Sequence, residues 1–196
     1  MPAATDADAP DRTPGRGRIS VRALLLLAAV AIGVYSIDQG SKFLITENLE
    51  IGDLVPVLGE VLQLHYVTNS GAAFSLASGF TWILSIVAGA VIVIIVIFAP
   101  RIRSLGWATM FGLVLGGALG NITDRLFREP SFGQGHVVDF IQVWGFPAIF
   151  NGADIAVVSS MGLFILLSLR GIGLDGTRTP MVKPTPKPDA KPTEKA

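Results

Sequence analysis

The stretch that decides the fold runs from Phe80 to Ala99 and reads FTWILSIVAGAVIVIIVIFA, with no charged residue. It lies in the second half of a longer run, from Val61 to Pro100, that contains no Asp, Glu, Lys or Arg. A helix rises about 1.5 Å per residue, so roughly 20 apolar residues cross the hydrocarbon core of a bilayer. The stretch is therefore predicted to be a transmembrane helix.

Three more uncharged segments lie on either side of this one, at 23–37, 105–123 and 155–169. The composition agrees with a membrane protein, because only 15% of the residues are charged, against about a quarter in soluble domains. We therefore expect an α-helical membrane protein with four transmembrane helices, near residues 20–38, 80–99, 104–123 and 153–170.

The ends of the chain have a different composition. Residues 1–18 are rich in Pro, Asp, Arg and Gly, and residues 175–196 are rich in Pro, Lys and Thr. Such segments bury too little apolar surface to fold. We expect disordered cytoplasmic tails at 1–18 and 173–196 around one domain of residues 19–172. The first apolar segment is not expected to be a cleaved leader, because Ile37-Asp38-Gln39 is no small-residue cleavage site.

The distribution of Lys and Arg predicts the orientation. The N-terminal arm, the turn with Arg101 and Arg103, and the C-terminal segment hold 12 of the 15 basic residues. The other three, Lys42, Arg125 and Arg128, lie in or beside the two intervening loops. Basic residues stay in the cytoplasm, so both termini are expected inside and both loops, 38–79 and 124–152, outside.

Several function classes lack the residues they need. The net charge is zero and no basic patch is interleaved with aromatics, so no nucleic-acid partner is expected. The absence of cysteine excludes thiolate catalysis and Cys-based zinc sites. No H-E-x-x-H motif is present, and the only histidines, His65 and His136, lie in the outer loops. We expect no metal site.

The outer loops contain two β-like stretches, residues 61–67 and 137–144, each bounded by glycine. On one membrane face they could pair into a small sheet over the helix ends. Residues 42–49 are predicted to form a short interfacial helix. The third apolar segment carries Gly112, Gly116 and Gly120 at four-residue spacing, which is typical of close helix packing in lipid.

Two carboxylates lie where apolar segments meet the outer loops. Asp124 ends the third segment, on one helix face with Asn121 and Arg125. A negative charge is unfavourable at a helix C-terminus, which favours a functional or ion-paired role for Asp124. Asp154 opens the fourth segment and fits equally well a simple helix start with Asn151 as N-cap. The two roles of Asp154 are compatible.

Two neighbouring carboxyl groups can hydrolyse a peptide. They cannot both ionise cheaply, so they share a proton. The ionised group takes a proton from water while the protonated group polarises the scissile carbonyl. A pair of aspartates is common in membrane proteins, so the surrounding residues must identify the function.

Five motifs of residues 20–170 resemble those of the lipoprotein signal peptidase (signal peptidase II) family. Their order and their positions relative to four membrane spans also match, and Ile155 departs from the serine common in the family. The motifs are Asp38-Gln39-Gly40-Ser41-Lys42, Asn69-Ser70-Gly71-Ala72-Ala73-Phe74, Gly120-Asn121-Ile122-Thr123-Asp124-Arg125, Val137-Val138-Asp139-Phe140 and Phe150-Asn151-Gly152-Ala153-Asp154.

The resemblance implies an aspartic endopeptidase of the bacterial inner membrane with a small extracytoplasmic β-sheet cradle. It implies removal of signal peptides from prolipoproteins, before the diacylglyceryl-cysteine, and inhibition by globomycin-type peptides. It implies no cofactor, and a monomer is expected. The roles it implies are catalytic for Asp124 and Asp154, supporting for Asn121, Arg125, Asn151 and Ala153, loop lining for Asn69 and Gly71, and structural polar anchoring for Asp38, Lys42 and Asp139.

Other readings of the sequence predict different placements. A small proton-linked transporter, the main alternative, would hold its acids near the membrane midplane on broken helices. A purely structural subunit leaves Asp124 unexplained. A rhomboid-type protease needs a Ser and a His in facing spans. A type I signal peptidase needs a facing Ser and Lys, but Ser41 and Lys42 are adjacent.

Overall fold

The structure is a computed structural model that describes residues 19–71 and 81–178 of the 196-residue chain. Four of its helices are long and apolar enough to cross a membrane, which confirms the predicted fold class. The elements in chain order are α1 (Val21–Asn48), β1 (Leu54–Leu58), β2 (Leu62–Asn69), α2 (Thr81–Phe98), the 3₁₀ turn η2 (Ala99–Arg101), α3 (Leu105–Phe127), β3 (Val137–Val143) and α4 (Gly152–Leu169).

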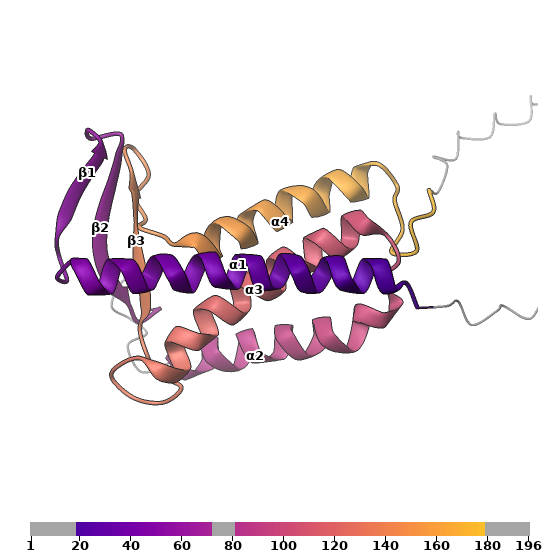
Figure 1. The fold of residues 1–196 in the computed structure, drawn as a ribbon, viewed down its shortest axis with the longest axis horizontal. Helices are drawn as coiled ribbons and strands as arrows, with labels where there is room; N and C mark the ends of the chain where they lie inside the picture. Colours follow the sequence, from indigo (N-terminus) through magenta and orange to yellow (C-terminus); the bar gives the residue numbers. More distant parts are fainter. Residues whose placement is uncertain (1–18, 72–80, 179–196) are drawn as a thin grey trace, which may run out of the picture.

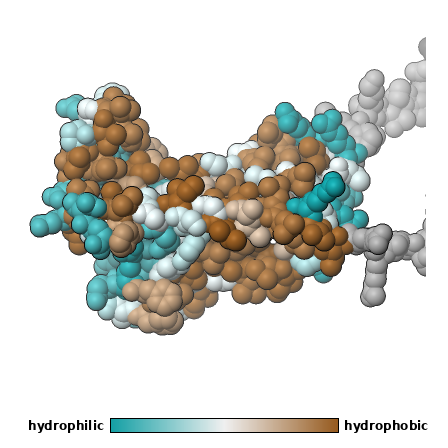
Figure 2. Space-filling view, in the orientation of Figure 1, coloured by the Kyte–Doolittle hydropathy of each residue, from teal (hydrophilic) through white to brown (hydrophobic). Residues whose placement is uncertain are grey.

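The four long helices lie side by side, and the sheet caps one end of the bundle (Figure 1). The ends of the described chain, near residues 19 and 178, lie at the opposite end of the bundle. Figure 2 shows hydrophobic residues over the middle of the bundle and hydrophilic residues gathered toward both ends. Large apolar side chains such as Ile32, Val93 and Val158 are exposed along the helices, as expected for a surface that faces lipid.

The prediction of a separate interfacial helix at residues 42–49 is wrong, because α1 continues without a break to Asn48. Asp38 and Lys42 explain the continuity. They lie four residues apart on one helix face, both fully buried, with Lys42 Nζ 2.9 Å from Asp38 Oδ2. This ion pair spans the point where the apolar segment was expected to end, so it fixes the helix there.

The sheet is antiparallel in the order β1-β2-β3. The two β-like stretches of the sequence are β2 and β3, and their pairing confirms the predicted sheet. Strand β1 was not predicted, since it contains Pro56. Proline lacks an N–H and is tolerated on an edge strand, which is the position that β1 occupies. A small apolar cluster under the sheet holds Ile45, Tyr66, Val138 and Phe140 and fastens the sheet to the end of α1.

Helix α3 packs against α1 through its glycines, as the four-residue spacing predicted. A Cβ added at Gly116 would lie 2.7 Å from the backbone oxygen of Ala31, and one at Gly112 would lie 2.8 Å from that of Leu27. Gly120 faces the carboxylate of Asp38 just as closely. The glycines therefore bring the backbones of α1 and α3 together up to the level of the charged groups.

The folded part of the chain extends beyond the predicted boundary at residue 172. Leu174 accepts hydrogen bonds from the backbone N–H groups of Arg103 and Ser104, and Ile172 pairs with Arg178. These contacts tie the end of α4 to the turn between α2 and α3. The rest of the predicted tails, at 1–18 and 179–196, lies outside the described residues.

Gly116 and Gly33 form a matched pair for testing the close packing. A Cβ at Gly33 would meet nothing within 4 Å. We expect Gly116→Ala to lower the melting temperature of the purified protein in detergent, because overpacking costs roughly 1–3 kcal/mol. Gly33→Ala should leave it unchanged or raise it, since alanine favours helix by about 1 kcal/mol over glycine. Equal melting temperatures for both variants would contradict the packing.

Candidate active site

Asp154 lies in the first turn of α4, where Asn151 is the N-cap. The backbone N–H of Asp154 donates to Asn151 Oδ1, and the backbone N–H of Asn151 donates to Asp154 Oδ2, each over 3.1 Å. This reciprocal capping box satisfies two helix-end donors. The helix-start role weighed from the sequence is confirmed, and it holds the Asp154 carboxylate in a fixed direction.

Asp139 lies on β3 and is 2% exposed. Its Oδ1 accepts from Asn151 Nδ2 over 2.7 Å, and its Oδ2 accepts from Asn69 Nδ2 over 2.8 Å. Its strand neighbours Val138 and Phe140 belong to the apolar cluster under the sheet. Because side chains alternate along a strand, Asp139 faces the other way, toward Asp154.

Burial is the main reason that the pKa of Asp139 is raised to about 6. The negative charge of Asp154 acts in the same direction, while the hydrogen bonds from Asn69 and Asn151 oppose the shift. The hydrogen bonds to Asp139 come from neutral amides, and together with the charge of Lys42 they offset only part of the loss of hydration. Asp139 is therefore the acid of this region that most readily holds a proton near neutral pH.

One cavity of about 480 Å³ contains both Asp139 and Asp154. It extends from the loop before α4 along one side of that helix, and most of its wall is apolar. An adjoining cavity of about 490 Å³ shares Asn69 and Asp139 with it and is bordered by Gly71. The other residues that line the first cavity are Asn69, Phe146, Ala148, Ile149, Phe150, Ile155, Val158 and Ser159.

Asp124, the other predicted catalytic residue, is fully buried, and both of its carboxylate oxygens accept ion pairs and hydrogen bonds. Its Oδ2 lies 2.7 Å from Lys42 Nζ and its Oδ1 lies 2.7 Å from Arg128 Nε. Gln39 Nε2 and the backbone N–H of Val138 also donate to it. Asp124 is absent from the lining of the cavity that holds Asp139 and Asp154. This cavity therefore does not bring Asp124 together with Asp154.

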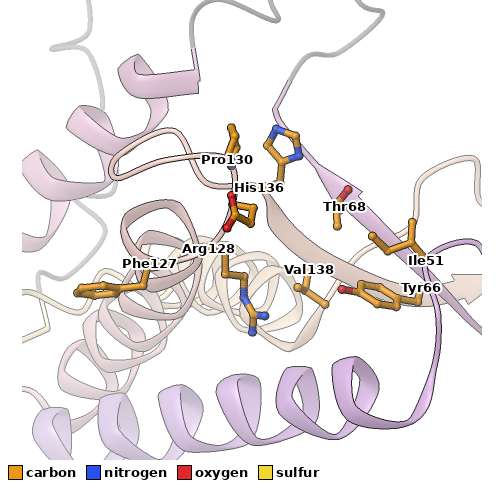
Figure 3. Close-up of a pocket in the computed structure, with 9 residues that line it drawn as sticks. Ile51, Tyr66, Thr68, Phe127, Arg128, Pro130, His136 and Val138 are labelled. Atoms are coloured by element: carbon orange, nitrogen blue, oxygen red, sulfur yellow. The ribbon is translucent and has the colours of Figure 1, made fainter.

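Figure 3 shows the region on the other side of β3. A cavity of about 560 Å³ lies there, and Arg128 reaches along it from the end of α3. Val138 lines this cavity, whereas the next residue, Asp139, lines the one described above. The alternation of β3 thus separates the ion-paired Asp124 and Arg128 from the pair of acids. The remaining lining residues are Ile51, Tyr66, Thr68, Phe127, Glu129, Pro130 and His136.

Asn121 connects the ion-paired group to the cavity. Its Nδ2 donates to Asp154 Oδ1 over 3.1 Å, and its Oδ1 accepts from Lys42 Nζ over 3.0 Å. Asp38 completes the connection between helices, since its Oδ1 accepts from the backbone N–H of Ala153 over 2.9 Å. The structure therefore brings together Asp38, Lys42, Asn121, Asn151 and Ala153 as predicted supporting residues.

On the side of the acid pair next to β2 lie Asn69, Gly71 and Arg125. Asn69 Oδ1 accepts from the N–H of Gly71 over 2.7 Å, which turns the Asn69 amide nitrogen toward Asp139. Gly71 has a φ of +80°, and a Cβ there would lie 3.3 Å from Arg125 Nη2 and clash with Leu84. Arg125 is 9% exposed, and within the described residues its Nη1 has no hydrogen-bond partner. Residues 72–74 of this motif lie outside the described residues.

The sequence reasoning missed two partners of Asp124, namely Gln39 and Arg128, and it took Asp139 for a polar anchor. An aspartate in the middle of the apolar strand Val137-Val138-Asp139-Phe140 was the available indication, because a buried charge needs a partner or a function. Over residues 19–71 and 81–178, no group of His, Cys, Asp or Glu could hold a metal ion.

The chain is similar to proteins of known family. Residues 30–170 match the family described as "Signal peptidase (SPase) II". The sequence is 57% identical to a lipoprotein signal peptidase of Leifsonia xyli, over 90% of this chain and 82% of that protein. It is 46% identical to a lipoprotein signal peptidase of Streptomyces coelicolor, over 86% of this chain and 80% of that protein.

Two solved structures, each described as a bacterial membrane enzyme, have a similar fold. One, at 1.9 Å resolution, gives a TM-score of 0.66 at 29% identity and covers 78% of this chain and 97% of its own. The other, at 2.3 Å resolution, gives a TM-score of 0.65 at the same identity and covers 91% of its own chain. The comparisons give no support to the transporter alternative, and each spanning helix of the structure is unbroken.

Infrared difference spectra of the detergent-solubilised protein can test the environment of Asp139. We expect a protonated-carboxyl band that disappears as the pH rises through about 6 and is missing in Asp139→Asn. In Asn69→Ala the band should persist to higher pH, because that substitution removes a hydrogen bond that lowers the pKa of Asp139. Asp175→Asn, in the exposed turn at the far end, is the control and should not move the band. A shift to lower pH in Asn69→Ala would contradict the described contacts.

Proposed function

The chain belongs to the signal peptidase II family, and we propose that Asp139 and Asp154 are the carboxylate pair with which this membrane aspartic endopeptidase removes the signal peptides of prolipoproteins. The observation that carries the assignment is that both acids line one cavity and share a ligand. Asn151 donates to Asp154 through its backbone N–H and to Asp139 through its side chain. One residue thus sets the relative position of both carboxyl groups.

The surroundings of the two acids favour different protonation states. Asp154 accepts from Asn121 and from the backbone of Asn151, and it lies at the positive end of the α4 dipole. Asp139 has the pKa that burial raises to about 6. Asp139 is therefore suited to act as the acid, and Asp154 is assigned the role of the base, the asymmetry that a two-acid hydrolysis needs.

Cleavage follows from this asymmetry. Asp154 accepts a proton from a water molecule as the water oxygen attacks the scissile carbonyl carbon. Asp139 donates its proton to the carbonyl oxygen, which gives a neutral diol. Asp154 then protonates the leaving nitrogen, the C–N bond breaks, and one diol hydroxyl returns its proton to Asp139. Both acids regain their starting states without a covalent intermediate.

The role of Asp124 in this proposal is structural. Two cations lie within 2.7 Å of its carboxylate, and Gln39 and the backbone N–H of Val138 also donate to it. It has no access to the cavity that would receive the scissile bond. Asp124 instead joins α1 to α3 through Lys42, as an ion pair that is buried and fully hydrogen-bonded.

The shape of the cavity suits an apolar signal peptide that ends at a lipid-modified cysteine. Its wall along α4, formed by Ile155, Val158 and their neighbours, is apolar, and the two acids lie at its polar end, beside the sheet. We propose that cleavage occurs just before the diacylglyceryl-cysteine, and that globomycin-type peptides occupy the same cavity. We also propose that a monomer suffices, since both acids and their ligands come from one chain.

Three single substitutions separate the candidate acids. We expect Asp139→Asn and Asp154→Asn each to reduce cleavage of a lipidated prolipoprotein at least a thousandfold with the fold intact. The double variant should be hardly worse than either one, because the pair acts as a unit. Asp124→Asn should mainly lower the melting temperature, because it leaves Lys42 and Arg128 less well compensated. A folded but inactive Asp124→Asn enzyme, beside an active Asp139→Asn enzyme, would restore the pairing of Asp124 with Asp154.

The orientation can be tested with reporter fusions. We propose that both termini are cytoplasmic and that the sheet and the acids face outward, since 12 of the 15 basic residues lie at the end of the bundle opposite the sheet or in the adjoining tails. Fusions at residues 50 and 130 should report an extracytoplasmic position, and fusions at the two ends of the chain a cytoplasmic one. A cytoplasmic reading at residue 130 would exclude a site at the outer face.

Lipid on the substrate should set the position of the scissile bond. Bare backbone in lipid costs several kcal/mol per unsatisfied group, so the bond must unwind at the interface, beside the polar groups of the sheet. A diacylglyceryl group stays in the bilayer by about 0.8 kcal/mol per buried CH₂ and holds the bond at that height. We expect unlipidated precursor to be cleaved far more slowly than lipidated precursor in liposomes. Equal rates would refute the anchoring argument and leave the acid pair untouched.

A further inference from the structure

Lys42 is a buried lysine with every N–H used. Its side chain is fully buried, and its Nζ lies 2.9 Å from Asp38 Oδ2, 2.7 Å from Asp124 Oδ2 and 3.0 Å from Asn121 Oδ1. An ammonium group has three donors and no acceptor. The three contacts therefore saturate it, and the two carboxylates fix where it lies.

The ammonium group decides which way the Asn121 amide is turned. An ammonium can meet only an acceptor, so the Asn121 atom that faces Lys42 must be the oxygen. Asn151 Nδ2 donates to the same oxygen over 3.2 Å. The amide nitrogen then has to face the other way, where it donates to Asp154 Oδ1 over 3.1 Å. A flipped amide would set donor against donor at Lys42 and oxygen against carboxylate at Asp154.

We propose that Lys42 is a positioning residue of the hydrolysis: through the oxygen of Asn121 it directs the amide nitrogen of Asn121 at Asp154 and so holds the Asp154 carboxylate in place for its role as the base. This inference rests on the proposed pairing of Asp139 with Asp154 and adds the group that positions its base. Lys42 makes no described contact with Asp154, so it reaches that carboxylate through Asn121, and its charge also acts to lower the pKa of Asp139.

The charged groups around the acid pair are Asp38 and Lys42 on α1 and Asp124 and Arg125 on α3. Lys42, Asp38, Asp124 and Arg128 together carry no net charge, and all but Arg128 are fully buried. The charges of this ion-paired group balance, and Arg125 remains as a further positive charge near the acid pair.

The test removes the ammonium group of Lys42 without leaving a buried charge unpaired. In Lys42→Met/Asp38→Asn one positive and one negative charge are lost, Asp124 keeps Arg128, and the new amide keeps an oxygen for the N–H of Ala153. Asn121→Leu removes the amide itself. We expect each enzyme to lose about 100-fold in kcat with little change in KM. The acidic limb of its pH profile should move to higher pH, because the acid pair loses a hydrogen-bond donor to its charged form.

The combined variant tests whether Lys42 and Asn121 act as one unit. If Lys42 acts through Asn121, adding Lys42→Met/Asp38→Asn to Asn121→Leu lowers kcat no more than about twofold further. Additive losses in kcat, or an acidic limb that stays in place in either enzyme, would overturn the proposal. If Lys42→Met/Asp38→Asn does not fold, Lys42→Gln/Asp38→Asn takes its place. That variant keeps a donor and should retain a wild-type acidic limb, and a shifted limb in it counts against the inference.

Ser85→Ala is the matched control for lost stability. Ser85 lies on α2 and donates to the backbone oxygen of Gly133 over 2.8 Å, so its loss removes a largely buried hydrogen bond away from the acids. We expect a lower melting temperature with unchanged kcat and pH profile. Failure of the proposed acid pair would appear separately, as an active Asp139→Asn enzyme. An inactive Asp139→Asn enzyme with additive Lys42 and Asn121 effects would refute this inference alone.

Discussion

The buried ammonium group of Lys42 is the interaction on which the outer end of this molecule depends. Removing an ion from water carries a penalty of several kcal/mol even inside a real protein, and only good geometry with further hydrogen bonds offsets it. Lys42 meets that condition with Asp38 from its own helix and with Asp124 and Asn121 from α3. Because Asp38 also accepts from the first turn of α4, one charged group sets the relative position of three helices.

The same neighbours divide the acids of the site into two kinds. Asp124 lies between two cations, so its charge is used in holding helices together. Asp139 is almost as deeply buried, but its hydrogen bonds come from the neutral amides of Asn69 and Asn151. Burial therefore raises the pKa of Asp139 to about 6 and makes it suitable as a proton donor. The chemical difference between these aspartates lies entirely in what surrounds them.

The sheet gives the membrane bundle a place where polar chemistry can occur. Strand β3 turns Val138 and Phe140 toward the apolar end of α1 and turns Asp139 toward α4. A helix end could not point neighbouring residues in opposite directions in this way, because its side chains are spread around the helix axis. In a strand, successive side chains point to opposite faces of the sheet. The hydrogen-bonded sheet also satisfies backbone groups at the level where a substrate has to unwind.

The sequence alone determined the four membrane helices, two of the three strands, the glycine-based packing of α3 and the family. Each of these follows from short-range patterns: uncharged runs, alternation, four-residue spacing and local motifs. It also placed Asp154 correctly at the start of α4, since a capping box is local. It could not show that α1 continues through Lys42, or that the β1 edge strand forms around Pro56. Nor could it tell which aspartate faces Asp154. Asp124 and Asp139 both lie in polar motifs near the outer interface, and their roles depend on contacts with Lys42, Asn69 and Asn151, which come from other elements. Only the tertiary structure shows how their surroundings differ, because the work of ionising a buried carboxyl group is set by the charges and donors within a few ångströms of it, and those are brought there by folding.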